Sequence, residues 1–365
     1  MGRLISLYWL CVIFCVCLVP VALKQTPTRN SETAESGVNV TKSSSEESRA
    51  VVGNLTTVSI DDGQIFPKIC GRQKAVIPRG RIIGGKKASL GEYPWMARLM
   101  HKDKHGHKSF GCSGFLVHSK FVITAGHCTH PHHTQRRGPL FSVVLGEHNI
   151  ETKTDCTPGG TFCADPIQTR KIAKVITHPD YNPENTAQHN DIAIIHLKKR
   201  AIFSDFVQPI CMPKNDSQIP ARYFLSGWGK TENEPISKIK MKVDIGTFDR
   251  DECVQKYSFL SIDLKDTQIC AGGEKQKDAC TGDSGGPLMM SSDNGTWYAS
   301  GIVSYGIGCG MKGWPGVYTN LVKFLPWIKT QITVNSMLSV RSNSKKKGKK
   351  RHKKIKVVKI QTKKN

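Results

Sequence analysis

Apolar residues in this chain occur as short runs separated by turn-forming residues. Between residues 82 and 331, runs such as Phe121–Thr124, Ile192–Leu197 and Gly301–Tyr305 alternate with stretches rich in Gly, Pro, Asn and Asp. Many short strands with turns between them are typical of an antiparallel sandwich or barrel. The pattern therefore predicts an all-β domain over residues 82–331.

One stretch near the end of that domain has helical periodicity instead. Within Phe324–Thr333, the apolar side chains Phe324, Trp327, Ile328 and Ile332 fall near one face. This is the pattern of a helix that packs on a core. We therefore expect a C-terminal helix at the end of the domain.

The region before the domain has a different amino-acid composition. Residues 1–23 are mostly apolar behind Met1 and Arg3, which predicts a signal peptide, a secreted extracellular product and no transmembrane segment in the mature chain. A signal anchor is the alternative, because about 20 apolar residues can span a bilayer. Residues 24–81 begin with a Ser-, Thr- and Glu-rich stretch without the apolar residues of a core, so we expect a flexible pro-segment.

Charge and cysteine content extend this picture. The 365 residues carry a net charge of +24, and Arg341–Lys364 has 13 basic residues and no acidic one, so we expect residues 332–365 to form a disordered basic tail. Ten of the 13 cysteines follow the signal peptide. An even number in an oxidising compartment favours five disulfides, and spacing alone leaves their pairing open. Four sequons would be glycosylated if exposed, at Asn39, Asn54, Asn215 and Asn294.

Three separated segments carry residues that could act together on a substrate. They are Thr124–Cys128 with His127, Asn190–Ala193 with Asp191, and Gly282–Pro287 with Ser284. A serine hydroxyl is a poor nucleophile at neutral pH and needs a base such as imidazole within hydrogen-bonding distance. Each segment alone is common, but His, Asp and Ser in this order and spacing indicate nucleophilic catalysis.

With these segments, residues 82–331 resemble the trypsin-like serine proteases of the chymotrypsin fold. The resemblance implies an all-β fold of two six-stranded antiparallel barrels with a C-terminal helix. It implies that His127 is the general base, that Asp191 orients its ring, and that Ser284 is the nucleophile. The backbone N–H groups of Gly282 and Ser284 would form the oxyanion hole, since glycine leaves the backbone open to the substrate.

The same resemblance implies the primary specificity. Asp278, six residues before the nucleophile, would lie at the base of the pocket and select Arg or Lys by its charge. Gly306 and Gly316 would line the walls, and Ser304 would offer backbone to an extended substrate. Pro315 stands where sodium-activated members of the family have tyrosine, so we expect no sodium activation.

The sequence Arg-Ile-Ile-Gly-Gly that starts at Arg81 resembles the activation site of the family. Cleavage after Arg81 would free the ammonium group of Ile82. In the family this group pairs with the aspartate before the nucleophile, here Asp283, and the pair orders the oxyanion segment and the pocket. The chain is therefore expected to be a zymogen.

The resemblance also implies the disulfide pairing. The expected bonds are Cys112–Cys128, Cys280–Cys309, Cys253–Cys270, Cys70–Cys211 and Cys156–Cys163. Cys70–Cys211 would tether the cleaved pro-segment, and the local Cys156–Cys163 bond is similar to one in insect clip-domain proteases of the easter and prophenoloxidase-activating types. A clip domain needs six cysteines and residues 25–69 have none, so we expect the catalytic half without the clip domain.

No metal or other cofactor is expected. Acidic residues in the loop Glu147–Asp165 leave calcium open, because some members of the family bind it near there, but they define no set of oxygen ligands. The crowded histidines His127, His130, His132 and His133 raise zinc as an alternative, but their spacing matches no closed structural site.

Together these features predict a secreted trypsin-like endopeptidase of an arthropod extracellular cascade, such as immunity, melanisation, clotting or patterning. The expected partners are protein substrates cleaved after Arg or Lys, an upstream activating protease and a serpin-type inhibitor. The tail would bind sulfated glycans or another polyanion, or have no partner, and no nucleic acid is expected outside the cell. The alternatives are a digestive trypsin and a catalytically silent protease fold that binds polyanions.

Overall fold

The computed structural model describes residues 65–74, 86–214, 219–232 and 234–338, which belong to one compact unit spanning Ser59–Asn365. The expected signal peptide, most of the pro-segment and the tail beyond residue 338 lie outside these ranges, as do Arg81, Ile82 and the sequons at Asn39, Asn54 and Asn215. None of the helices in the described ranges is long and apolar enough to cross a membrane.

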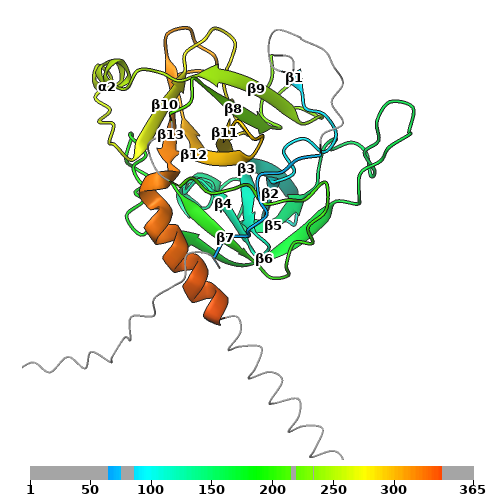
Figure 1. Ribbon diagram of the computed structural model, residues 1–365. Coiled ribbons are helices and arrows are strands. Elements are labelled where there is room, and N and C mark those ends of the chain that lie inside the picture. Colours follow the sequence, from blue (N-terminus) through cyan, green and yellow to red (C-terminus); the bar gives the residue numbers. More distant parts are fainter. Residues whose placement is uncertain (1–64, 75–85, 215–218, 233, 339–365) are drawn as a thin grey trace, which may run out of the picture. The chain divides into compact units, whose positions relative to one another are not determined.

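Six antiparallel strands close into a barrel in the first half of the unit (Figure 1). In barrel order they are β2 (Met96–Lys102), β3 (Lys108–His118), β4 (Phe121–Thr124), β7 (Ala193–Leu197), β6 (Gln168–Thr177) and β5 (Leu140–Leu145). β4 and β7 are buried at every position, as their continuous apolar runs predict. In the first half of β6, exposed positions alternate with half-buried ones, so one face of this strand meets solvent.

A second sheet is built from the other seven strands. In sheet order they are β1 (Lys86–Lys87), β9 (Met241–Gly246), β8 (Arg222–Gly227), β11 (Pro287–Ser291), β12 (Trp297–Tyr305), β13 (Pro315–Asn320) and β10 (Gln268–Gly272). An isolated bridge between Thr247 and Ala271 joins the chain just after β9 to β10. The prediction of two antiparallel β units is confirmed. The second unit differs from a six-stranded barrel because β1 adds a strand at the edge and only this bridge closes the ring.

Alternation along β8 shows how the two units share the core. Tyr223 and Leu225 belong to a core cluster inside the second sheet, whereas Phe224 packs edge-to-face on Trp297 with ring centroids 5.1 Å apart. Trp297 in turn belongs to the large core cluster that contains the buried side chains of the first barrel. Successive side chains on a strand point to opposite faces, so one strand serves both cores.

Two short helices lie outside the β units and were not predicted. α1 (Pro131–Thr134) follows β4, and α2 (Arg250–Ser258) begins after Asp249, whose side chain accepts a hydrogen bond from the N–H of Glu252. In α2 only Cys253 and Tyr257 are buried. The apolar stripe that would reveal a helix is therefore almost absent, and the N-cap defines its start.

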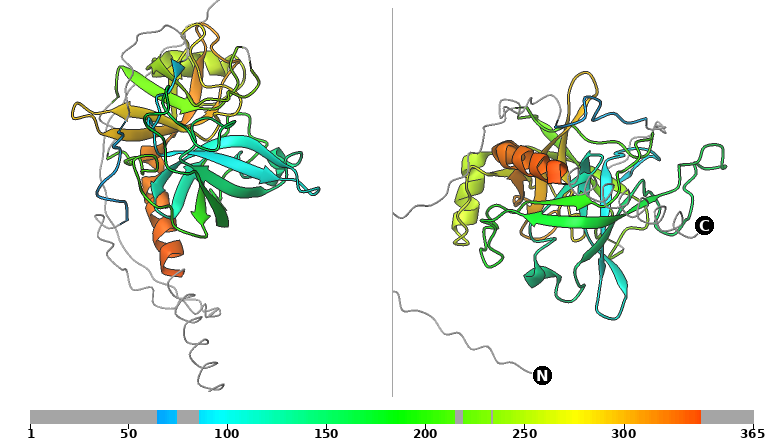
Figure 2. Two further views of the ribbon diagram at one scale, coloured as in Figure 1. Left: turned by 90° about the vertical axis from the view of Figure 1, so that its right-hand side faces the viewer. Right: turned by 90° about the horizontal axis from the view of Figure 1, so that it is seen from below.

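The C-terminal helix is present and longer than expected. The chain is helical from 321 to 338 (Figures 1 and 2), so the prediction of disorder from residue 332 is wrong for 332–338. Ile332 is 2% exposed and Asn335 is 4% exposed, and the Lys174 ammonium donates to Oδ1 of Asn335 at 3.4 Å. Packing on the first barrel thus continues the helix beyond its apolar stripe.

Five disulfides stabilise the unit, with the pairing that the family resemblance implies. They are Cys70–Cys211, Cys112–Cys128, Cys156–Cys163, Cys253–Cys270 and Cys280–Cys309. The segment around Cys70 is also held by backbone hydrogen bonds. The N–H of Gly71 donates to Pro209 and its carbonyl accepts from Trp297, so residues 65–74 are attached to the rest of the folded unit by hydrogen bonds as well as by the Cys70–Cys211 disulfide.

Candidate active site

His127 and Asp191 meet because their strands are neighbours. His127 follows β4 and Asp191 precedes β7, and in that ladder Thr124 pairs with Ala193. Oδ2 of Asp191 lies 2.8 Å from Nδ1 of His127, and its Oδ1 accepts the backbone N–H of His127 at 2.8 Å. These two contacts fix both the position and the tautomer of the imidazole.

Two hydroxyl groups from the second sheet complete the surroundings of Asp191. Ser304 Oγ donates to Oδ2 at 2.5 Å, and Thr319 Oγ1 donates to the Asp191 carbonyl at 2.9 Å. The aspartate is fully buried. The prediction for Ser304 concerned only its backbone, and Thr319 was not predicted at all. No local motif marks either hydroxyl, because each meets Asp191 only through the packing of the two units.

Asp191 and His127 each shift the pKa of the other in favour of its charged form. Burial raises the pKa of Asp191, but the His127 ring and the hydrogen bonds outweigh it, so the pKa is lowered overall. Burial lowers the pKa of His127, but the Asp191 carboxylate outweighs that effect and the pKa is raised overall. The pair therefore favours a carboxylate beside a ring that readily takes up a proton.

Ser284 lies between the two β units, just before β11. Its carbonyl accepts the N–H of Ser113 on β3 at 2.8 Å, and the next N–H, of Gly285, donates to Val303 on β12. Gly285 has φ +80°, and a Cβ there would lie 2.1 Å from Oγ1 of Thr124. Only glycine fits such a place. Among the described contacts none joins Ser284 Oγ to Nε2 of His127, a bond that is often long before substrate binds.

Asp278 lines a pocket of the second sheet, and its place at the base of the specificity pocket stays a prediction. Its carboxylate accepts the N–H groups of Ala279 at 2.8 Å and Gly310 at 3.1 Å, and burial raises its pKa to about 6. A Cβ on Gly306 would lie 3.6 Å from Cα of Gly316, so the two glycines, which the resemblance placed on the pocket walls, lie close together. Neither of them is among the residues that line the pocket of Asp278.

Asp283 is a second carboxylate on the same pocket. It accepts the N–H of Gly229 at 2.8 Å and the N–H of Cys280 at 3.1 Å, and burial raises its pKa to about 6. Both carboxylates line a pocket of about 1280 Å³. Within the described residues, no cation pairs with either of them.

The family follows from comparison with known proteins. A family model described as Trypsin matches residues 82–328. The chain belongs to the trypsin family of serine proteases. It is 40% identical over 259 residues to phenoloxidase-activating enzyme 1 of Spodoptera litura, covering 70% of this chain and 68% of that protein. It is 38% identical over 293 residues to the Spaetzle-processing enzyme of Drosophila melanogaster, covering 76% and 72%.

A solved structure agrees with this assignment. The Drosophila Grass clip serine protease of the Toll pathway matches this trypsin-family protease with a TM-score of 0.62 and 31% identity, over 75% of this chain and 77% of that one. The match to the insect clip-domain group, drawn from the loop disulfide and the motifs, is therefore confirmed.

Several of the residues weighed as metal ligands have other partners in this structure. Within the described part of this trypsin-family protease, the one cluster of ligand atoms is Cys112, His127 and Cys128, and its two sulfurs form a disulfide. In the loop considered for calcium, Glu147 pairs with Arg98 at 3.7 Å and Glu151 pairs with Lys238 at 2.9 Å. The protein's own cations thus occupy carboxylates that calcium would need.

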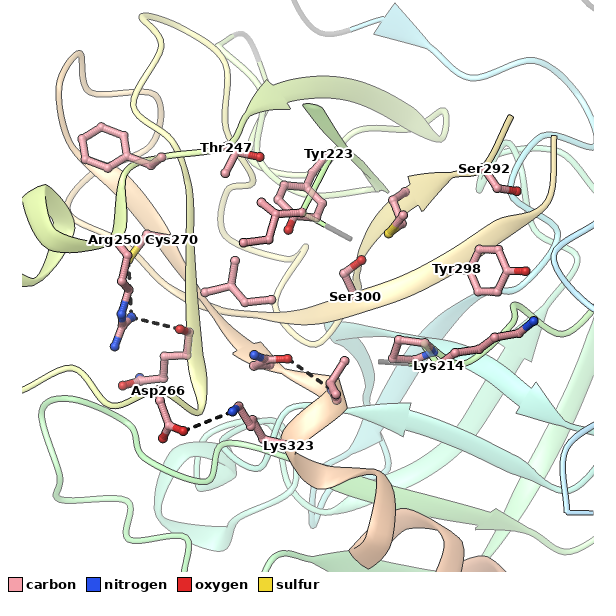
Figure 3. A pocket seen from close by; sticks show the side chains of 18 of the residues that line it. Lys214, Tyr223, Thr247, Arg250, Asp266, Cys270, Ser292, Tyr298, Ser300 and Lys323 are labelled. Carbon is pink, nitrogen blue, oxygen red and sulfur yellow. Dashed lines mark hydrogen bonds and ion pairs between the residues drawn. The ribbon is translucent and has the colours of Figure 1, made fainter. Parts of the chain in front are cut away.

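A separate pocket of about 580 Å³ opens on the second sheet (Figure 3). It is lined by Tyr223 and Ser300, and by Asn320 at the opposite end of β13 from Gly316. The sequon residue Asn294 also lines it and is exposed. This pocket therefore lies away from Asp278.

Proposed function

We propose that this trypsin-family protease is the zymogen of an endopeptidase that cleaves proteins after Arg or Lys. The observation that carries the proposal is the pair of half-buried carboxylates, Asp278 and Asp283, which line one pocket and have no ion-pair partner among the described residues. A buried carboxylate without a cation is unfavourable. Asp278 would receive the Arg or Lys of a substrate, and Asp283 would receive the ammonium group of Ile82.

In the proposed mechanism, His127 takes the proton of Ser284 as the hydroxyl attacks the peptide carbonyl, and later gives it to the leaving amine. Asp191 keeps the ring in the required tautomer and stabilises the imidazolium. The N–H groups of Gly282 and Ser284 donate to the oxyanion of the tetrahedral intermediate. The loss of one such donor typically costs about 3 kcal/mol of transition-state stabilisation.

Activation would couple these parts. Cleavage after Arg81 creates a new N-terminus, and its pairing with Asp283 would pull the adjacent Gly282–Ser284 segment into its working shape. The Cys70–Cys211 bond would keep the cleaved segment attached to the protease.

The setting that we propose is a secreted arthropod cascade, because the similar proteins include a phenoloxidase-activating enzyme and a Spaetzle-processing enzyme. An activating protease, a serpin-type inhibitor and, through the tail, a polyanion would be its partners.

The proposal is tested with purified chain and its Arg81→Gln variant. Treatment of the wild type with a protease that cleaves after Arg should start hydrolysis of Arg and Lys peptides but not of Phe or Leu peptides. The variant should stay uncut at residue 81 and inactive, and Ser284→Ala should be cut and remain inactive. Full activity of uncut Arg81→Gln chain, or equal rates on Arg and Phe peptides, would contradict the proposal.

A further inference from the structure

Arg98 is a buried cation that neither the motifs nor the proposed mechanism explains. It lies on β2 and is 8% exposed. The guanidinium carbon is 4.6 Å from the ring centroid of Phe110 and 5.7 Å from that of Trp228. Cations over aromatic faces are attracted to them, more strongly where water is excluded.

Stability alone is a weak reason for this arrangement. Glu147 is the ion-pair partner of Arg98, at 3.7 Å, and Nε of Arg98 is buried without a hydrogen-bond partner. Burial lowers the pKa of Arg98 and raises the pKa of Glu147, so both charges lose hydration. Apolar residues of similar size often stabilise such a site as well as an ion pair does.

The Phe110 and Trp228 rings connect Arg98 to the surroundings of Gly282. A Cβ on Gly282 would lie 3.3 Å from Cε1 of Phe110 and 3.0 Å from Cα of Gly229. Gly229 follows Trp228 in the chain, and its N–H donates to Asp283. Gly282 therefore lies close to both Phe110 and Gly229, and Arg98 packs on Phe110 and on Trp228, the residue before Gly229.

We propose that Arg98 is a positioning residue for the oxyanion hole: its guanidinium holds Phe110 against Gly282 and keeps the Gly282 N–H aimed at the reacting carbonyl. The inference rests on the proposed role of Gly282. Glu147, two residues after the end of β5, orients the guanidinium, so the segment that follows β5 is connected to the oxyanion hole through Arg98.

The test compares two inhibitors of the cleaved enzyme. A peptidyl arginine aldehyde forms a tetrahedral adduct with Ser284 and needs the oxyanion hole, whereas benzamidine needs only the pocket of Asp278. In Arg98→Met, binding of the aldehyde should weaken about tenfold, part of the loss that removal of an oxyanion donor causes, while benzamidine binding stays unchanged. Phe110→Leu should show the same selective loss, because it removes the ring face that Arg98 covers.

Two further variants separate positioning from stability. Arg98→Met leaves Glu147 buried without a partner, so Arg98→Met/Glu147→Gln removes both charges; it should fold and still bind the aldehyde weakly. Lys240→Met is the matched control, because Lys240 is also buried and lies 5.9 Å from the Trp228 ring; it should leave the ratio of the two affinities unchanged. The proposal is wrong if both inhibitors weaken together, or if the double variant binds the aldehyde like the wild type. Wild-type hydrolysis of Arg peptides reports separately on the proposed function.

Discussion

At the scale of single residues, the pKa of the buried Asp191 is shifted in the opposite direction from the pKa values of the half-buried Asp278 and Asp283. The pKa of Asp191 is lowered because its neighbours are the His127 ring and several donors. Asp278 and Asp283 accept backbone N–H groups only, apart from a contact of Asp278 with Tyr318, so burial raises their pKa values to about 6. The surroundings of each carboxyl group, rather than the residue type, thus decide its pKa. Those of Asp191 favour the ionised form, whereas those of Asp278 and Asp283 favour the protonated form as long as no cation is close.

Replacing Asp278 with Ser should lower kcat/KM for Arg peptides about a thousandfold, because the substrate cation would be buried without a partner.

In the wild type, the Asp278 carboxyl takes up a proton as the pH falls through about 6. Benzamidine binding to the cleaved enzyme should therefore weaken over that range, and titration of affinity against pH measures it. Affinity that is constant from pH 5 to pH 8 would contradict the role of this carboxylate.

Asp283→Asn should change the pH dependence of stability of the uncleaved chain. The ordinary pKa of this carboxyl is 3.8 and burial raises it to about 6 in the folded protein. The folded wild type binds the proton more tightly than the unfolded chain, so this carboxyl becomes less favourable for folding as the pH rises through that interval. From pH 4 to pH 7, the free energy of unfolding of the variant should rise relative to that of the wild type by up to about 3 kcal/mol, as measured by urea unfolding. An identical difference at both pH values would refute this.

At the scale of elements, packing against neighbours extends a helix beyond the apolar pattern of its sequence. The C-terminal helix continues through 338 because Ile332 and Asn335 are buried. His178 reinforces the contact, with ring centroids 5.4 Å from Phe324 and 4.9 Å from Trp327. The short α2 is held by its N-cap, by the bond of Cys253 to Cys270 and by the hydrogen bond from the buried Tyr257 hydroxyl to the Pro315 carbonyl.

A chain that ends at Gln331 should therefore be less stable than one that ends at Leu338. The shorter chain loses the buried Ile332 side chain, whose removal from a core typically costs about 2–5 kcal/mol. Thermal and urea unfolding of the two truncated proteins measure the difference. Equal stability would mean that residues 332–338 do not support the fold.

At the scale of the whole molecule, the candidate site exists only where the two β units meet. The first barrel contributes His127 and Asp191, and the second sheet contributes Ser284 and the hydroxyl of Ser304. The Ser113 N–H on β3 holds the Ser284 carbonyl across the junction. Small shifts between the units would therefore separate base and nucleophile.

The tail should bind polyanions without taking part in this junction. The chain ending at Leu338 lacks all 13 basic residues of Arg341–Lys364, so it should leave a heparin column at much lower salt than the full chain, by analogy with counterion release from nucleic acids. After cleavage its rate on a small Arg peptide should match that of the full chain. If both elute at the same salt, the polyanion site is on the folded unit instead.

The sequence by itself determined the chemistry. The segments around His127, Asp191 and Ser284, and the family resemblance that they support, predicted the β architecture and the disulfide partners. Such motifs are readable because the residues that identify them are adjacent in the chain. The C-terminal helix was found for the same reason, from an apolar stripe within ten residues of sequence.

Tertiary structure alone decided the contacts between distant segments. Ser304 donates to Asp191, which lies 113 positions away in the sequence. Arg98 contacts Phe110, Trp228 and Glu147, which come from three different parts of the chain. The edge strand β1 and the extension of the last helix belong to the same class. Each depends on strand register and on burial beside a particular neighbour, and these are properties of the packed molecule that no short stretch of sequence contains.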